Sequence, residues 1–325
     1  MSYPEQKRKS ALLIFGVLIG AIYGVVIRLV AGAHFSGKYL EVISIACLFL
    51  GPFAVGFITI FIAEGGVRRR LWTWFFLPWI PVTIASLTTM ALNIEGTICV
   101  VMFLPIGLAL STLGGVIAGI LVRVTKSPAP QMTTLACVTV LPLILWPIEA
   151  QIQAANATRV VNTSIDIAAP AETVWTKIER VAPIQDSELP HAWTTTIGFP
   201  KPDQATLSFE GVGGVRHATF KGGVLFIEKI DQWEPGRRLA FAIHPEQVPS
   251  RTLDEHVTVG GQYFDVLRGE YTLESLPNGT RLHLSSQHRI STRFNWYSQL
   301  WTDAAMRDIQ GSILFVIKHR CERNQ

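Results

Sequence analysis

Charged residues are scarce in this chain of 325 residues, and the shortage is uneven. Asp, Glu, Lys and Arg make up 16% of the sequence, whereas about a quarter is usual for soluble proteins. Residues 1–150 hold ten of the 28 Lys/Arg and five of the 24 Asp/Glu, which leaves eighteen and nineteen for residues 151–325. The first part is therefore too poorly charged for an ordinary soluble domain. The net charge of +4 comes from cations that flank apolar runs, so it does not indicate a nucleic-acid partner.

Cysteine is also rare, and its distribution excludes a disulfide framework. Three of the four cysteines fall in apolar runs before residue 150, and Cys321 alone lies after it. Spacings typical of metal sites, such as HxH, HExxH or CxxC, do not occur. The run Gly211-Val212-Gly213-Gly214 leads into a strand pattern, whereas a dinucleotide fingerprint leads into a helix. We therefore expect no metal and no cofactor.

Long apolar runs are abundant in the first 150 residues. Five of them approach or exceed the ~20 residues that a helix needs to cross a bilayer. They cover about residues 11–31, 41–63, 72–93, 97–123 and 131–148. The sequence predicts an all-α block of five transmembrane helices over residues 1–150, with kinks at its prolines.

Ionisable residues are missing from the middle of these runs. Glu41, Glu64 and Glu95 lie at the ends of runs or in short loops. A proton or ion pathway needs ionisable groups deep in the membrane. The pattern argues against a pump or a proton-coupled transporter and favours an anchor that contacts membrane lipids.

Cations gather on one side of the predicted spans. If all five spans cross, eight cations share a side and two, Lys38 and Arg28, fall on the other. The eight are Lys7, Arg8, Lys9, Arg68, Arg69, Arg70, Arg123 and Lys126. The positive-inside rule then places the N-terminus in the cytoplasm. Five spans put residues 151–325 in the periplasm or cell exterior, beside a bacterial inner or plasma membrane.

Residues 158–325 have the pattern of an α+β domain, joined to the spans by a polar tether at 151–157. A strand at 160–167 precedes a helix at 173–181, which follows Pro170. Alternating runs then predict strands at 205–210, 215–221, 224–233, 238–244, 263–275 and 280–290. Turn signals such as Asn278-Gly279 indicate an antiparallel meander. A closing helix at 294–320 has an apolar face made of Tyr297, Trp301, Ala305, Ile309, Ile313, Val316 and Ile317.

Three stretches of this domain carry a family resemblance. They are the strand with Ala169-Pro170-Ala171-Glu172-Thr173-Val174-Trp175, the run Gly211-Val212-Gly213-Gly214-Val215-Arg216, and the hairpin pattern from Glu228 through Trp233 to Phe241. In this order they resemble the START-like (SRPBCC) superfamily, in particular its polyketide cyclase branch, over residues 158–322. The resemblance implies a helix-grip fold, in which an antiparallel sheet and a long C-terminal helix enclose an apolar cavity.

The cavity implied by this resemblance lies between the sheet and the 294–320 helix. Strand alternation selects an apolar lining of Phe226, Phe241, Tyr271, Leu273, Leu284, Tyr297 and Trp301. The polar candidates for ligand contact are Arg216, Glu228 and His288. Arg216 could pair with Glu228 or bind an anionic ligand head, and the sequence leaves both possibilities open.

These observations predict a membrane-anchored START-like protein that binds a lipid or another hydrophobic small molecule. No catalytic residue is assigned. One alternative is a cyclase/dehydratase-type enzyme acting on a membrane-derived substrate, which needs a desolvated acid with a hydrogen-bonded partner. The other is a membrane interaction or sensor protein without a ligand, which a filled core between sheet and helix would favour.

Overall fold

The computed structural model of the chain describes residues 3–31, 34–35, 38–39, 44–64, 70–125, 127–249 and 258–323. Arg68, Arg69, Lys126 and Glu41 lie outside the described residues, as does the side chain of Lys38. The chain divides into two compact units, Met1–Ala154 and Ala155–Gln325. Each unit has its own packed interior and is described by itself.

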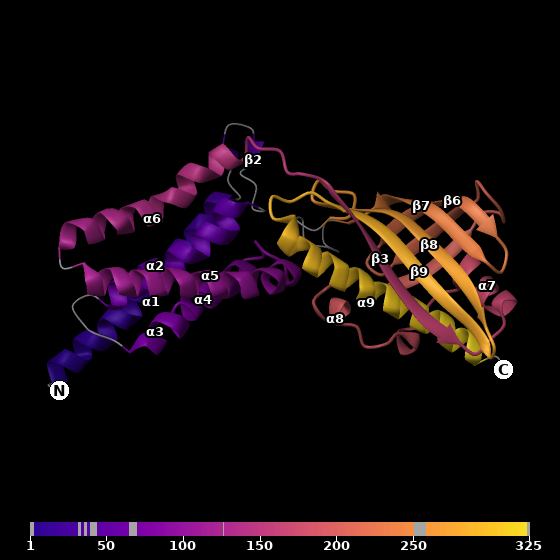
Figure 1. Cartoon of the computed structure of the whole chain (residues 1–325), viewed down its shortest axis with the longest axis horizontal. Helices are drawn as coiled ribbons and strands as arrows, with labels where there is room; N and C mark the ends of the chain where they lie inside the picture. The colour runs from indigo at the N-terminus through magenta and orange to yellow at the C-terminus, as the bar shows by residue number, and fades with distance from the viewer. Residues whose placement is uncertain are drawn as a thin grey trace. The chain divides into compact units, whose positions relative to one another are not determined.

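The first unit is helical (Figure 1). Its elements are α1 (Tyr3–Ala31), the short strands β1 (His34–Phe35) and β2 (Lys38–Tyr39), the π-helix η1 (Ala46–Leu50), α2 (Gly51–Ala63), α3 (Leu71–Phe76), α4 (Trp79–Ala91), α5 (Thr97–Val124) and α6 (Pro128–Glu149). Five helical stretches are long and apolar enough to cross a membrane: Gln6–Val30, Ala46–Ala63, Leu71–Ala91, Thr97–Val124 and Pro128–Glu149. The five apolar helices expected from the sequence are therefore present.

Two prolines lie at interruptions of the helices that do not end the spans. Leu77 and Pro78 separate α3 from α4, yet both keep right-handed helical backbone angles. Pro52 follows directly on the π-helical turn of η1 and occupies the first turn of α2. Because proline has no amide hydrogen, it fits where a backbone donor has no partner. The spans therefore continue past Pro52 and Pro78, and kinks at these prolines stay a prediction.

Helices α2 and α5 pack backbone to backbone at two glycines. A Cβ atom on Gly56 would lie 1.9 Å from the carbonyl oxygen of Ser111. A Cβ atom on Gly114 would lie 2.0 Å from the carbonyl oxygen of Phe53. Glycine is thus required on both helices. Small residues allow this close approach, which is common where helices pack inside membranes.

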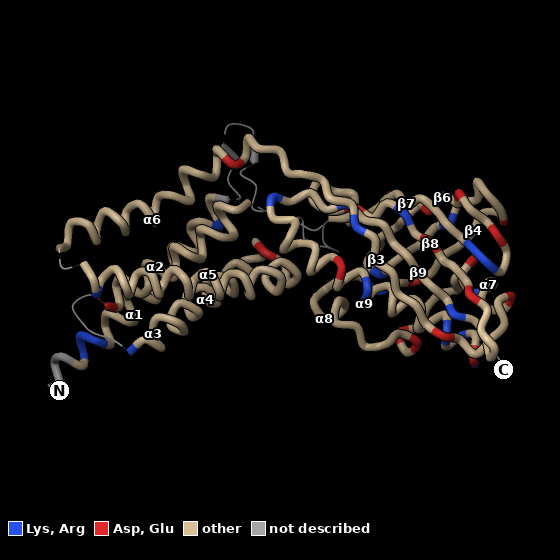
Figure 2. The backbone as a smooth tube through the Cα atoms, viewed as in Figure 1, with Lys and Arg blue, Asp and Glu red and all other residues tan. Residues whose placement is uncertain are grey.

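Antiparallel packing brings four of the described cations of the helical unit to one end. A Cβ atom on Gly16 of α1 would approach Ala63, and one on Gly24 would approach Val55, so α1 and α2 run in opposite directions. The carboxylate of Glu64 lies 3.5 Å from the guanidinium of Arg123, at the end of α2 to which α1 brings Lys7, Arg8 and Lys9. Arg28 pairs with Glu95 at the other end. Figure 2 shows charges at the helix ends and few between them.

The second unit is a sheet of seven antiparallel strands that packs against a long helix (Figure 1). The strands are β3 (Ala157–Ile167), β4 (Pro202–Leu207), β5 (Val215–Phe220), β6 (Val224–Glu234), β7 (Arg238–Gln247), β8 (Phe264–Leu276) and β9 (Gly279–Ile290). Their order is β3-β9-β8-β7-β6-β5-β4. Strands β4 to β9 form the predicted meander, and the first strand closes on the last. This is the architecture that the START-like resemblance implies.

The helices of this unit cover one face of the sheet, here called the inner face. They are α7 (Ala171–Glu179), the 3₁₀ turn η2 (Asp186–Glu188), α8 (Trp193–Thr196) and α9 (Asn295–Glu322). Helix α7 ends two residues before its predicted end, because Arg180 is extended and Val181 pairs with Ala205 of β4. Strand β3 begins three residues before its predicted start, which adds Arg159 to the sheet.

The buried face of α9 differs from the predicted one. Its deeply buried residues include Asp303, Met306, Gln310, Leu314, Ile317 and Cys321, at helical spacing. Ala305, Val316 and Ile317 of the predicted face are buried, whereas Tyr297, Trp301, Ile309 and Ile313 are partly exposed. The apolar face predicted from the sequence did not include Asp303 and Gln310. Both are accommodated inside because they find hydrogen-bond partners there.

A hydrophobic cluster fills the space between one end of the inner face, α7 and α9. We call this the closed end, and its buried members include Trp175, Ile178, Leu239, Phe241, Tyr271, Leu273, Leu282, Leu284, Leu314 and Ile317. Trp175 packs edge-on against Trp233, with ring centroids 5.0 Å apart. These two tryptophans come from two of the sequence stretches that carry the family resemblance. Burying aromatic side chains of this size contributes strongly to stability.

Candidate functional site

Two pairs of polar side chains, here together called the polar row, lie on the inner face, one on β3 and β9 and the other on β5 and β6, with β7 and β8 between them. Strand register places Arg159 of β3 opposite His288 of β9, and Arg216 of β5 opposite Glu228 of β6. All four residues lie on the inner face by alternation. Arg216, Glu228 and His288 are 2%, 8% and 0% exposed. Buried ionisable groups on the inner face of a sheet need partners, and these partners define the candidate site.

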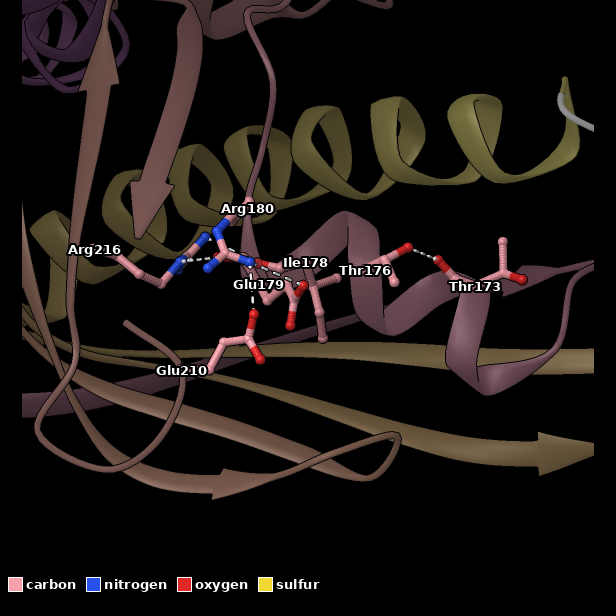
Figure 3. A network of polar contacts seen from close by, with 7 residues as sticks. All are labelled: Thr173, Thr176, Ile178, Glu179, Arg180, Glu210 and Arg216. Carbon is pink, nitrogen blue, oxygen red and sulfur yellow. Dashed lines mark hydrogen bonds and ion pairs between the residues drawn. The ribbon is translucent and has the colours of Figure 1, made fainter. Parts of the chain in front are cut away.

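Arg216 joins the sheet to the end of α7. Its Nη1 donates to Glu228 Oε2 at 2.5 Å, its Nη2 to the carbonyl oxygen of Ile178 at 3.1 Å, and its Nε to that of Glu179 at 3.2 Å. Figure 3 shows the guanidinium directed at the last turn of α7. The last carbonyls of a helix have no partner within the helix, so a cation there is favourable.

The Arg216–Glu228 pair is shielded from water. The guanidinium carbon lies 4.9 Å from the centre of the Phe241 ring. Burial raises the pKa of Glu228, and the positive charge of Arg216 opposes that rise. Burial likewise raises the pKa of the neighbouring Tyr271 to about 12. Arg216 thus has the carboxylate partner that was one of its two predicted roles. Its other predicted role, binding an anionic ligand head, stays a prediction.

His288 belongs to a second polar cluster, formed with β3 and α9. Arg159 donates to Asp303 through Nη2 at 2.5 Å and Nε at 3.4 Å. His288 Nε2 lies 3.3 Å from Thr302 Oγ1 and 3.6 Å from Asp303 Oδ1. The other ring nitrogen, Nδ1, is buried without a hydrogen-bond partner. Burial lowers the pKa of His288, so the ring is favoured in its neutral form.

Gln310 fixes α9 to the sheet next to this cluster. Its amide nitrogen donates to the carbonyl oxygen of Val161 at 3.1 Å and to Ser286 Oγ at 2.8 Å. Its amide oxygen accepts from Thr163 Oγ1 at 2.6 Å. The side chain is 1% exposed and its polar atoms are partnered. Gln310 therefore fixes α9 to β3 and β9 with its own hydrogen bonds complete, whereas His288 Nδ1 has no hydrogen-bond partner.

Sequence reasoning missed Arg159, Asp303 and Gln310 at the site. Arg159 was assigned to the region before the first strand, although Thr158-Arg159 continues its alternation. Asp303 and Gln310 are seven residues apart, as are Gln310 and Ile317, so they share a helix face. A polar residue repeating on an apolar helix face was the signal that could have identified them.

The predicted apolar lining divides between two environments. Phe241, Tyr271, Leu273 and Leu284 belong to the packed cluster of the closed end. Phe226, Tyr297 and Trp301 are partly exposed instead. Trp301 packs against Trp193 of α8 at 6.4 Å, and Phe226 packs edge-on against Phe220 at 5.5 Å.

The partly exposed residues define the open end of the inner face. It comprises Phe226, Phe264, Val266 and Trp301. Phe264 lies 5.5 Å from the His288 ring, measured between ring centroids. A surface hollow of about 570 Å³ lies at the β4 edge of the sheet and is lined by Pro183, Ile184, Gln185, Asp186, Lys201 and Lys221. The two lysines of that hollow pair with Asp186 and Asp203.

The residues that the structure describes form no evident metal-binding site. Within them, no group of three or more His, Cys, Asp or Glu side chains is placed to hold an ion. His283 and His288 point to opposite faces of β9, as alternation predicts. His283 pairs with Glu274 on the outer face, and His288 is buried inside.

Comparison with known proteins adds structural similarities at low sequence identity. No family model matches the chain, and no curated protein matches it. The Zhui aromatase/cyclase from Streptomyces sp. R1128 has 18% identity, with 52% of this chain and 96% of that chain covered and a TM-score of 0.31. A Mesorhizobium loti protein has 14% identity, coverage of 51% and 99%, and a TM-score of 0.32.

A third solved structure is the Aha1 dimer from Colwellia psychrerythraea. Its sequence is 17% identical to this chain, and the TM-score is 0.28. The match covers 50% of this chain and 96% of the Aha1 chain. All three similarities extend over about half of this chain and nearly all of the other protein. The description of the fold rests on the strand order and helix packing given above.

Proposed function

We propose that this protein is a membrane-anchored binder of a small hydrophobic molecule, held at the open end of the C-terminal unit. The observation that carries the binding proposal is the buried, unpartnered Nδ1 of His288 beside partly exposed apolar side chains. Binding sites for small molecules combine apolar walls with a few oriented polar groups. The open end has both features, and the closed end has a completed apolar core.

Membrane anchoring is supported by the surface of the helical unit. Large apolar side chains there are exposed, among them Phe15 at 53%, Trp72 at 70% and Ile144 at 56%. Exposing apolar area to water costs roughly 25 cal/mol per Å². Lipid removes that cost, and the clustering of charges at the helix ends fits a bilayer (Figure 2).

The proposed orientation has the N-terminus in the cytoplasm and the C-terminal unit across the membrane. It is supported by Lys7, Arg8, Lys9 and Arg123 at one end of the helices. Alkaline phosphatase fused after Gln325 should be active in a bacterial host, because that enzyme folds in the periplasm. An inactive fusion, with a cytoplasmic reporter active at the same position, would contradict this orientation.

Native mass spectrometry of the full chain tests the binding proposal. The protein is purified in detergent from its own host, and the molecules released from it are identified. We expect an apolar compound that is bound by the wild type and depleted in a chain carrying Trp301→Ala at the open end. Leu92→Ala, at an exposed position of the helical unit, is the matched control. Equal retention by the two variants would contradict binding at the open end.

An interaction or sensor protein without a ligand is the second candidate. Four of the seven predicted lining residues are packed into the closed end, and this observation favours it. The two proposals differ at the open end. A sensor protein would release no compound in the mass spectrometry experiment, and its partner would protect Trp301 and Trp193 from solvent.

A further inference from the structure

We propose that the ligand of the open end carries an uncharged hydroxyl group, which donates a hydrogen bond to Nδ1 of His288. This inference rests on the proposed function, because it names the polar group of the molecule bound there. The ligand class is an apolar alcohol or phenol. Three properties of the polar row lead to this class.

The first property is the tautomer of His288. Thr302 Oγ1 donates its hydrogen to the carbonyl oxygen of Gln299 at 3.4 Å, so it offers lone pairs to the His288 ring. Both carboxyl oxygens of Asp303 accept hydrogen bonds from Arg159, and a carboxylate can only accept. Because both neighbours of Nε2 are acceptors, Nε2 carries the hydrogen of the neutral ring. In the neutral ring, Nδ1 then carries a lone pair and is an acceptor.

The second property is the charge balance along the row. Arg159 is paired with Asp303, and Arg216 is paired with Glu228. An anionic ligand head would have to share one of these cations with a carboxylate. A cationic head would have to share a carboxylate with a guanidinium. An uncharged polar group avoids both costs.

The third property is the burial of the unused acceptor. His288 is 0% exposed, and Phe264 and Val266 of β8 flank it on the open side. A buried acceptor without a partner is unfavourable, and a single hydroxyl donor satisfies it. The apolar remainder of the ligand then contacts the aromatic residues of the open end.

Matched probes test the hydroxyl requirement on the full chain in phosphatidylcholine nanodiscs. The first pair is 2-naphthol and 2-methoxynaphthalene, and the second is 1-dodecanol and dodecyl methyl ether. Dodecanoate provides the anionic comparison. Equilibrium dialysis against empty nanodiscs corrects for partitioning into lipid. We expect the alcohol of at least one pair to bind about tenfold more tightly than its ether, as one hydrogen bond would give.

Two substitutions of His288 separate the roles of its nitrogens. His288→Gln places an amide near the Nε2 position, which retains the contact with Thr302 and removes the acceptor at Nδ1. His288→Asn places an amide near the Nδ1 position. We expect His288→Gln to abolish the preference for alcohol over ether and His288→Asn to retain part of it. His283→Gln, on the outer face of the same strand, should leave the preference unchanged.

Each outcome of these measurements tests either the hydroxyl assignment or the proposed binding function. Equal affinities of alcohol and ether in the wild type would overturn the hydroxyl assignment, whether or not the variants fold. Tighter binding of dodecanoate than of dodecanol would overturn it in favour of an anionic head. Failure of all five probes to bind above the empty-nanodisc level would count against the proposed function itself.

Discussion

The two units use apolar side chains in opposite directions. In the helical unit, residues such as Leu18 and Ile144 lie on the outside, at 52% and 56% exposed, while glycines allow the helices to touch inside. In the C-terminal unit, residues such as Leu239 and Leu282 are 0% exposed and lie between sheet and helix. The first arrangement is stable when lipid covers the surface, and the second is stable in water.

The two units also differ in where they place their charged pairs. The helical unit pairs its carboxylates at helix ends, as Glu64 does with Arg123 and Glu95 with Arg28. The C-terminal unit places the Arg216–Glu228 pair inside, on the face of a sheet. A buried pair is costly to desolvate and contributes little net stability. Breaking such a pair by removing one partner is nevertheless strongly destabilising, because it leaves an uncompensated buried charge.

Separating the units should produce the largest effect. Residues 155–325 should be soluble and folded alone, because about 170 residues can bury a sufficient core. Residues 1–154 should precipitate in the absence of detergent or lipid. Size-exclusion chromatography and circular dichroism of the two fragments measure this. A helical fragment that is soluble and monomeric in plain buffer would contradict the need for lipid. An aggregated C-terminal fragment would contradict independent folding in water.

Breaking the buried ion pair should destabilise the C-terminal unit strongly. Arg216→Met leaves the carboxylate of Glu228 buried without its partner, which typically costs 3–5 kcal/mol. The control is Arg268→Ala, which removes the exposed pair with Asp231 and should cost at most about 1 kcal/mol. Urea unfolding followed by tryptophan fluorescence gives both free energies. Similar losses in the two variants would show that the Arg216 pair is not shielded.

A matched pair of leucines compares the two kinds of surface directly. Leu282→Ala removes a fully buried side chain from the closed end and should cost about 2–5 kcal/mol. Leu18→Ala, at an exposed position of α1, should change stability in detergent by less than about 0.5 kcal/mol. Thermal unfolding of the two variants in the same detergent makes the comparison. A large loss from Leu18→Ala would reveal a protein contact at that position.

The smallest expected effect is the acid sensitivity of the contact between η2 and α9. Arg320 hydrogen bonds hold the pKa of Glu188 at about 2, below its ordinary value of 4.5. A lowered carboxyl pKa stabilises the fold above pH 4.5, and this stability is lost as the pH falls toward 2. We expect a loss of about 1 kcal/mol across that range. The free energy of unfolding of the wild type and of Glu188→Gln is measured from pH 4.5 to pH 2. If the wild type loses no more stability than Glu188→Gln, Glu188 makes no such contribution.

The strand order and the main helices could be predicted because they depend on local patterns. Alternation from Val215 to Phe220 and the turn at Asn278-Gly279 are properties of a few neighbouring residues, and they appear as β5 and the β8–β9 hairpin. The two tryptophans of the family resemblance, Trp175 and Trp233, meet in the core. Local pattern and tertiary packing agree at these places.

The polar part of the candidate site could be predicted only in part. Arg216, Glu228 and His288 stand at inward-facing strand positions, which alternation identifies. Strand alternation does not apply to Asp303 and Gln310 of α9. Their burial depends on partners from β3, more than a hundred residues earlier in the chain, and for Gln310 also from β9. The closed end was predicted as cavity wall because alternation shows which face a side chain occupies, but not whether helices fill the space above it.

Hydrogen exchange on the full chain in nanodiscs tests the central claim most directly. Backbone exchange is measured by mass spectrometry, before and after a delipidated sample receives host lipid extract. We predict slower exchange at the open end, in peptides covering residues 264–268, 286–292 and 296–306, because a bound ligand restricts local opening there. Peptides covering residues 271–276 and 310–320 of the closed end should not change. Protection confined to the closed end, or no protection in either region, would contradict a ligand site at the open end of the inner face.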